Sequence, residues 1–364
     1  MTTRLAQLSE WMKQNDVSFT FIQEKANLFY FTNFYCEPHE RLVALLAFPE
    51  EDPCLICPNM EVSLAKESGW CGEILGYSDS EDPWQLVTAA IQKREVATQK
   101  CAIEKSSLSY GRSEALTKRF PLLQFTDCEE VCMGLRKKKS AKEVEILREA
   151  AKLADFGVEV GIYGVQAGRT EMELVALIEF ELKRKGVRDM SFSTLVLSGE
   201  QSAHPHGKPG SREIKKGDFI LFDLGVVLEG YCSDITRTIA YGDISEEQSR
   251  IYNTVLQAQQ TALSLCQPGT EIGALDRAAR NVITNAGYGA YPHRIGHGLG
   301  IDVHELPSLN KTNKELLEEG MTFTIEPGIY VPSIGGVRIE DDVLLTKSGY
   351  ECLTQYPKEL TIVS

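Results

Sequence analysis

The sequence has no long apolar run and no apolar segment near its start. Across the 364 residues no stretch of about 18 consecutive apolar side chains occurs, which is roughly the length that spans a bilayer. The opening residues, MTTRLAQLSEWMKQND, carry scattered charges where a secretory signal would have an apolar core. We therefore expect a cytoplasmic protein with no membrane partner.

Positive charge is also in short supply. The chain has 38 Lys and Arg residues against 52 Asp and Glu residues, and its formal net charge is −14 at pH 7. Such an excess of negative charge repels the phosphate backbone that nucleic-acid binders neutralise, so we expect no nucleic-acid partner. The composition, 43% hydrophobic and 25% charged, is that of a folded globular protein and excludes a disordered chain.

Several familiar motifs are missing. The ten cysteines have no framework spacing, which favours reduced thiols over disulfides. Cys54 and Cys57 are spaced like a redox or zinc motif, but no second ligand pair lies nearby, and residues three apart in a strand point to opposite faces. There is no Walker lysine, GxGxxG or GxSxG motif, so neither a phosphate cradle nor a serine hydrolase is predicted.

The length favours two hydrophobic cores, because single cores usually stop growing near 250 residues. Residues 1–125 alternate short β-type runs with helical patterns and predict an α/β domain. Residues 126–139, which end in a basic stretch, are predicted to be a linker, and 140–364 are predicted to be the catalytic domain. Capping boxes predict that helices begin after Ser140, Thr170 and Ser245, and another helix is expected over 272–286.

Two aspartates in the second half occupy strands that normally disfavour them. If Glu229 and Gly230 form a two-residue hairpin loop, Asp223 lies opposite Thr236 and is a diagonal neighbour of Asp234. Their surroundings are rich in Phe, Leu and Ile, and burying two carboxylates there requires a compensating charge. Taken alone, the pattern also fits an amphipathic hairpin whose aspartates point to solvent.

A second acidic hairpin strengthens the case for a cation. A loop centred near Ser333 places Glu326 directly across from Glu340, and like charges in that position are destabilising unless an ion lies between them. His297, set among glycines and located in sequence between the two hairpins, offers a nitrogen ligand. Four carboxylates and one imidazole match the charge of two divalent ions, as in two-metal hydrolysis. The mainly oxygen donors favour Mn²⁺, with Co²⁺ and Zn²⁺ as alternatives.

The order Asp, Asp, His, Glu, Glu resembles the pita-bread metallopeptidases, which include methionine aminopeptidase, prolidase and Xaa-Pro aminopeptidase. The motifs that carry the resemblance are FDLGVVLEGYCSDITRT, HRIGHGLGIDVHE, TIEPGIY and VRIEDD, all within residues 140–364. The additional N-terminal domain and the segment LRKKKSAKEVEILREA resemble the prolidase and Xaa-Pro aminopeptidase branch. This implies a creatinase/prolidase-like α/β domain followed by an α+β pita-bread domain.

The resemblance also implies residue roles. Asp223, Asp234, His297, Glu326 and Glu340 would hold two metal ions, and Glu326 would also relay a proton. His206 and His304 would be catalytic pocket histidines, with His204 two residues before the first. Arg338 and Thr236 would support the site.

The implied reaction is hydrolysis of peptide bonds preceding proline. The expected substrate is a small peptide with proline in second position, and the family implies a homodimer. Two alternatives share the scaffold. One is a metal-free binding protein and the other a creatinase-like amidinohydrolase.

Overall fold

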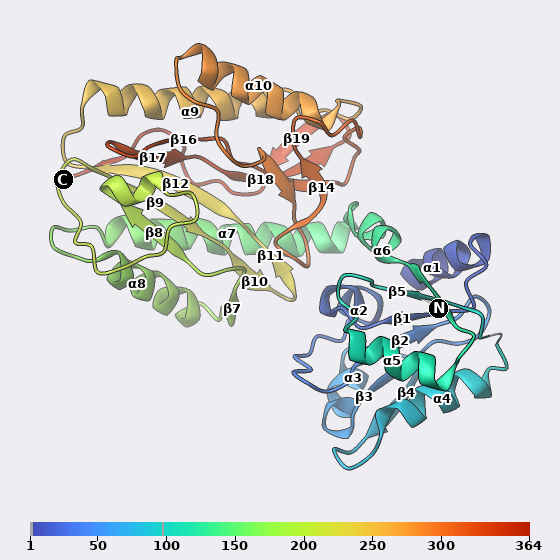
Figure 1. Ribbon diagram of the computed structural model, residues 1–364. Helices are drawn as coiled ribbons and strands as arrows, with labels where there is room; N and C mark the ends of the chain where they lie inside the picture. The colour runs from blue at the N-terminus through green and yellow to red at the C-terminus, as the bar shows by residue number, and fades with distance from the viewer. Residues whose placement is uncertain (1–2, 97) are drawn as a thin grey trace. The chain divides into compact units, whose positions relative to one another are not determined.

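The computed structural model describes residues 3–96 and 98–364, which form two compact units that meet in sequence between Arg136 and Lys137 (Figure 1). The elements of the N-terminal unit are α1 (Thr3–Gln14), β1 (Phe19–Ile22), α2 (Lys25–Thr32), β2 (Ala44–Ala47), β3 (Cys54–Pro58), the 3-10 turn η1 (Asn59–Glu61), α3 (Val62–Glu67), β4 (Glu73–Tyr77), α4 (Pro83–Lys93), β5 (Lys100–Ile103), α5 (Tyr110–Arg119), β6 (Gln124–Asp127) and α6 (Glu129–Arg136). Its mixed sheet has the order β4-β3-β2-β1-β5-β6. This unit is α/β.

The N-terminal core forms where the apolar runs of the sequence become strands. Phe19 and Phe21 on β1 pack with Leu46, Phe48 and the inner faces of α4 and α5. Both faces of β3 are buried, so its two cysteines lie inside the core. All ten cysteines are free thiols. No helix within the described residues is long and apolar enough to cross a membrane.

Residues 126–139, predicted to be a linker, contain the end of β6 and the helix α6. In α6, Cys132 and Arg136 are both buried one helical turn apart. Arg136 Nη1 donates a hydrogen bond of 2.8 Å to Asn27 Oδ1 on α2, so this helix packs against the N-terminal unit. The basic run that follows begins the second unit.

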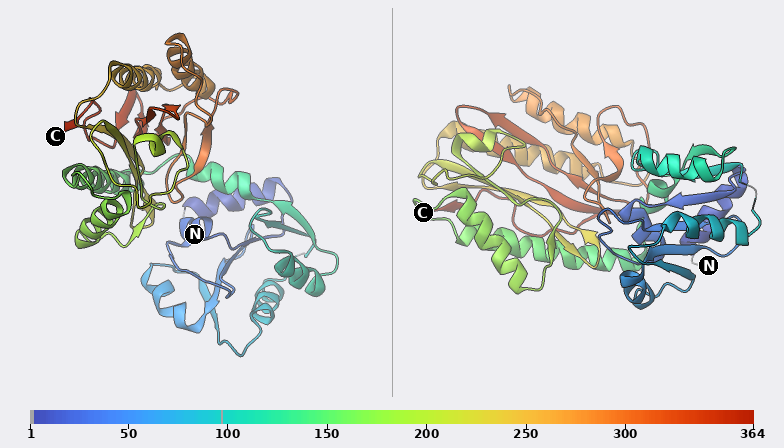
Figure 2. Two further views of the ribbon diagram at one scale, coloured as in Figure 1. Left: turned by 60° about the vertical axis from the view of Figure 1, so that its left-hand side comes forward. Right: turned by 60° about the horizontal axis from the view of Figure 1, so that its bottom comes forward.

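The C-terminal unit has two pairs of helices outside its sheets. Its elements are α7 (Ala141–Tyr163), α8 (Glu171–Arg184), β7 (Asp189–Met190), β8 (Leu195–Ser198), the 3-10 turn η2 (Gly199–Ala203), β9 (Asp218–Leu224), β10 (Val226–Leu228), β11 (Tyr231–Cys232), β12 (Ile235–Tyr241), α9 (Glu246–Ser264), α10 (Ile272–Asn285), β13 (Gly296–Gly298), β14 (Glu305–Leu309), β15 (Thr322–Ile325), β16 (Gly328–Val331), β17 (Gly335–Arg338), β18 (Asp341–Thr346), β19 (Gly349–Cys352) and β20 (Ile362–Val363). Within this unit, α7 and α8 lie on one side of the strands and α9 and α10 on the other (Figure 1, Figure 2).

Each helix pair covers its own hydrophobic core. The apolar faces of α7 and α8 pack against the sheet β20-β12-β9-β8. Those of α9 and α10 pack against β14-β13-β15-β18-β19 and the hairpin β16-β17. The predicted helices are confirmed, and the capping boxes at Ser140, Thr170 and Ser245 are all formed.

Both predicted hairpin registers are confirmed. Asp223 pairs with Thr236, and Glu229 and Gly230 form the turn with φ values of 47° and 83°, which a two-residue type I′ loop requires. In the second hairpin, Ile325 pairs with Asp341 and Gly328 with Arg338. The same register on both sides places Glu326 opposite Glu340.

A buried ion pair joins the two layers next to these hairpins. Arg237 Nη2 on β12 lies 2.7 Å from Asp341 Oδ1 on β18, and the two side chains are 1% and 0% exposed. Arg237 Nη1 also donates to the backbone carbonyls of Thr236 and Glu340. Lys358 Nζ contacts the other Asp341 oxygen at 2.6 Å, so the carboxylate is fully compensated. These contacts fix the position of Thr236 relative to Glu340.

Removing one partner of this pair should leave the buried charge of the other without compensation. We expect Asp341→Ala to lower the free energy of unfolding of the C-terminal unit by about 3–5 kcal/mol, because Arg237 would lose its counter-charge. Scanning calorimetry of the full chain measures the effect. Glu247→Ala, which breaks the exposed Arg250–Glu247 pair, is the control and should change little. An Asp341→Ala protein with the wild-type transition would show that the pair does not hold the layers together.

Candidate metal centre

A cavity of about 400 Å³ in the C-terminal unit gathers the predicted site residues. Its walls include all five candidate metal ligands together with His206, His304 and Arg338. The other lining residues are Phe192, Ser193, Leu195, Pro205, His293, Arg294 and Val303. Two larger cavities lie in the N-terminal unit and one of about 440 Å³ lies beside α7 in the C-terminal unit, and among their lining residues there is no comparable group of carboxylates and imidazoles.

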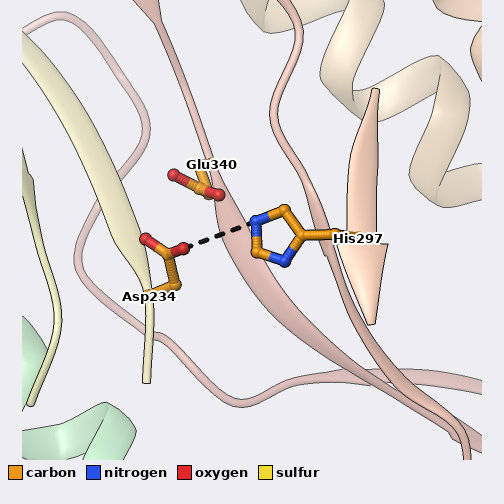
Figure 3. A group of neighbouring side chains, drawn as sticks. All are labelled: Asp234, His297 and Glu340. Carbon is orange, nitrogen blue, oxygen red and sulfur yellow. Dashed lines mark ion pairs between the residues drawn. The ribbon is translucent and has the colours of Figure 1, made fainter. Parts of the chain in front are cut away.

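Asp234, His297 and Glu340, which line this cavity, form one group of neighbouring donors (Figure 3). One donor atom from each lies within 4.8 Å of the other two, and all three residues are buried. Asp234 lies just before β12, Glu340 between β17 and β18, and His297 within β13. One strand and two segments beside strands therefore bring oxygen and nitrogen donors together.

The ring orientation of His297 is fixed by its neighbours. Its Nδ1 lies 3.1 Å from the carbonyl oxygen of Gly298, and because a carbonyl only accepts, Nδ1 carries the proton. Nε2 is then the free lone pair, and it lies 3.6 Å from Asp234 Oδ2 and 3.5 Å from Glu326 Oε1. The residue thus presents a nitrogen lone pair to the carboxylates.

The glycines beside His297 allow this close approach. A Cβ atom at Gly296 would lie 1.9 Å from the Thr324 carbonyl oxygen, and one at Gly298 would lie 2.1 Å from the Leu306 carbonyl oxygen. β13 is therefore pressed between β14 and β15, and only glycine fits on either side of the histidine.

Arg338 supports the cavity from one side. Its Nη2 donates to Asp223 Oδ2, its Nε donates to Thr236 Oγ1 at 3.1 Å, and its Nη1 donates to the Tyr330 hydroxyl at 3.1 Å. Thr236 Oγ1 in turn donates to Glu340 Oε2 at 2.5 Å. The supporting position predicted for Arg338 and Thr236 corresponds to these contacts.

The carboxylates shift one another's ionisation. Burial, followed by Glu340 and Asp223, raises the pKa of Asp234 well above its usual value. Burial and Glu340 raise the pKa of Glu326. Burial and Asp223 raise that of Glu340 to about 7. Burial and His304 lower the pKa of His297 to about 3, so the imidazole is neutral.

This donor set fits divalent metal ions. Asp234 Oδ1 is buried without a hydrogen-bond partner in the described part of the chain, although its backbone N–H is held 3.0 Å from Asp342 Oδ2. A neutral imidazole beside closely spaced carboxylates lacks positive charge, and bound cations would supply it. Oxygen and imidazole donors without thiolates are the ligands that Mn²⁺ and related ions accept.

The two pocket histidines occupy different positions around the centre. The ring of His304 stands edge-on to that of His297, with centroids 4.3 Å apart. His204 and His206 are both exposed, and of the two only His206, on the loop after η2, lines the cavity.

Three polar residues of this region were missed by the sequence analysis. His293 and Arg294 line the cavity, and Tyr330 joins His293 to Arg338, with 2.9 Å between His293 Nε2 and the Tyr330 hydroxyl. The adjacent His293 and Arg294, directly ahead of the glycine-flanked His297, were the available signal. Nothing local in the sequence indicated that Tyr330 would reach them.

Comparison with known proteins identifies the two units separately. Residues 145–347 match the model of metallopeptidase family M24, and residues 4–138 match the creatinase/prolidase N-terminal domain. A Bacillus subtilis protein named "Putative dipeptidase YkvY" is 54% identical over 361 residues, with 99% of each chain covered.

Solved structures agree with this assignment. The Pyrococcus horikoshii prolidase is 35% identical with a TM-score of 0.91 and covers 99% of this chain and 100% of its own. A Bacillus anthracis Xaa-Pro dipeptidase is 33% identical with a TM-score of 0.93, covering 99% of both chains. The predicted fold, a creatinase/prolidase-like domain followed by a pita-bread domain, is confirmed. The chain is a metallopeptidase of family M24, in the pita-bread branch that contains the prolidases.

Proposed function

We propose that this enzyme hydrolyses the bond before proline in small Xaa-Pro peptides, using two divalent metal ions. Supporting this are the donor set around the cavity and the similarity to proteins described as prolidases and Xaa-Pro dipeptidases. Asp223, Asp234, His297, Glu326 and Glu340 would hold the ions, and Mn²⁺ is the metal we expect. The homodimer and the cytoplasmic location remain predictions from the sequence.

The bound ions would supply Lewis-acid polarisation of the scissile carbonyl. The chain's own residues would handle the proton. Glu326 Oε1 accepts a hydrogen bond from Thr324 Oγ1 at 3.3 Å and lies 3.5 Å from His297 Nε2, so Oε2 is the oxygen free to take a proton from the attacking water. Glu326 would then return that proton to the departing proline nitrogen.

His206 and His304 would stabilise the charge that develops on the carbonyl oxygen. Both lie in the cavity wall on loop segments rather than in the cluster of carboxylates. A ring N–H aimed at this oxygen contributes most in the transition state, where the negative charge is largest. The two histidines are therefore assigned to the substrate and not to the metal.

A peptide bond before proline lacks a feature that other peptide bonds have, and the proposed mechanism does not need that feature. Its nitrogen carries no hydrogen, so the scissile amide cannot donate a hydrogen bond to an enzyme. The proposed site needs only the free amine and the carbonyl oxygen of the peptide. The cavity wall near Phe192, Leu195 and Val303 provides apolar surface for the pyrrolidine ring.

The hydrogen bond from Thr236 to Glu340 should matter for metal binding. We expect Thr236→Val to weaken the affinity for Mn²⁺ about 10–100-fold, because it removes the contact that orients this ligand. Thr238→Val is the control, because this buried residue lies two positions along the same strand and its hydroxyl bonds the Arg338 backbone and no candidate ligand. Calorimetric titration of Mn²⁺ into both metal-free variants measures the difference. Equal losses in the two variants would show a packing effect and not an effect on the ligand.

His206 and His204 provide a second matched comparison. We expect His206→Ala to lower kcat by about 10²-fold with its metal content unchanged, because one donor to the carbonyl oxygen is lost. His204→Ala, outside the cavity wall, should keep wild-type kinetics. Steady-state assays and metal analysis of each variant test this prediction. A loss of kcat in His204→Ala but not in His206→Ala would exchange the roles assigned to the two histidines.

Proline specificity is tested with two dipeptides. We expect Ala-Pro to be cleaved with a kcat/KM at least about tenfold above that of Ala-Ala, because the apolar wall favours the pyrrolidine ring in the transition state. Both are assayed with Mn²⁺ at pH 7–8. Creatine serves as the control for an amidinohydrolase and should not be hydrolysed. Equal rates on the two dipeptides would refute this specificity.

A further inference from the structure

Arg294 stands in the cavity wall without an ion-pair partner among the described residues. Of the cavity-lining residues, Arg338 and Arg294 are the two with permanent positive charge. Arg338 uses its guanidinium on Asp223, Thr236 and Tyr330. The Arg294 guanidinium, in contrast, has no hydrogen bond, ion pair or ring contact within the part of the chain that the structure describes.

The backbone around Arg294 is held firmly. Its carbonyl oxygen accepts a hydrogen bond of 2.8 Å from His293 Nδ1. The carbonyl oxygen of the next residue, Ile295, accepts one of 2.7 Å from the Glu326 backbone N–H, and its N–H donates to Leu309. The backbone of Arg294 is thus anchored just before β13, three residues before His297. A side chain on a fixed backbone loses less entropy when it binds a ligand.

An unpaired guanidinium in this place carries an electrostatic cost. Arg294 is half-buried, and burial lowers its pKa while nearby Glu326 opposes that shift. Four carboxylates line the same cavity, yet none forms an ion pair with it. A partly desolvated charge without a partner is destabilising, and a bound anion would remove that cost.

The proposed substrate carries such an anion. A free dipeptide is a zwitterion whose amine end belongs with the carboxylates and metal ions, which leaves its carboxylate in need of a cation. A cavity of about 400 Å³ is small for a binding site and suits a short peptide. Each of the three guanidinium nitrogens of Arg338 already donates a hydrogen bond within the protein. We propose that Arg294 binds a carboxylate of the substrate and thereby determines specificity, an inference that rests on the proposed function.

Two carboxylates could fill this role, the free C-terminus of a dipeptide and an acidic side chain before the proline. Both have the same chemistry, a planar anion that a guanidinium binds through two parallel hydrogen bonds. The C-terminal carboxylate would make the enzyme prefer dipeptides to longer peptides. The acidic side chain would make it prefer Asp or Glu in first position.

Four substrates separate these sources, namely Ala-Pro, Ala-Pro-amide, Asp-Pro and Asp-Pro-amide. They are assayed with the Mn²⁺-loaded wild type, Arg294→Met, Arg294→Lys and, as a control, Arg184→Met, which changes an exposed arginine on α8. If Arg294 binds the C-terminus, the wild type prefers acid to amide by about ten- to hundredfold. Arg294→Met loses this preference, Arg294→Lys keeps part of it, and Arg184→Met keeps all of it.

Each other outcome has a defined meaning. A preference of the wild type for Asp-Pro-amide over Ala-Pro-amide that disappears in Arg294→Met assigns the carboxylate to the side chain. An Arg294→Met protein that loses activity equally on acids and amides overturns the proposal, as does one with wild-type ratios. The acid-to-amide ratio is also measured on Ala-Ala, so it tests Arg294 even if the enzyme shows no preference for proline.

Discussion

Mutual repulsion among buried carboxylates is the constraint on which the rest of the C-terminal unit depends. Asp234, Glu326 and Glu340 face one another in a space where burial alone already raises their pKa values. Arg338 is tied to Asp223, and His297 is neutral. Arg294 lines the same cavity but forms no ion pair with these carboxylates, so the protein itself supplies less positive charge than they need. Metal ions would complete the fold as well as the chemistry, because a ligand that binds only the native state stabilises it.

The surrounding structure resists this repulsion by fixing the backbones that carry the carboxylates. The ion pair between Arg237 and Asp341 joins the two layers one residue beyond Thr236 and Glu340. Arg338 and Thr236 then orient individual oxygens. The helix pairs on either side bury separate apolar cores, so the strands cannot relax apart without exposing one of them. Because the surrounding residues are held rigidly, the buried carboxylates can stay close together despite their repulsion.

The sequence could predict which residues pair across a hairpin, because this pairing depends only on short-range register. Strands joined by short loops have their pairing set by counting, which places Asp223 opposite Thr236 and Glu326 opposite Glu340. Counting cannot place one hairpin against the other, or His297 against both, because those distances depend on sheet packing over more than a hundred residues. The resemblance to known peptidases supplied that step. The sequence did not indicate Arg294 and Tyr330, because their importance depends on contacts that only the folded structure shows to be present or absent.

The residues proposed for the reaction and those proposed for its specificity lie in different parts of the fold. The candidate ligands lie on or beside strands held by both cores, where a substitution disturbs packing. The residues proposed to contact substrate lie mostly in loops, in the segments 192–195, 205–206, 293–294 and 303–304. Loops vary at lower cost to the fold, so related proteins can keep one metal centre and change what it acts on. Membership of the metallopeptidase family therefore indicates the kind of chemistry, whereas the choice of peptide would depend on the charge and shape that these loops bring to the cavity.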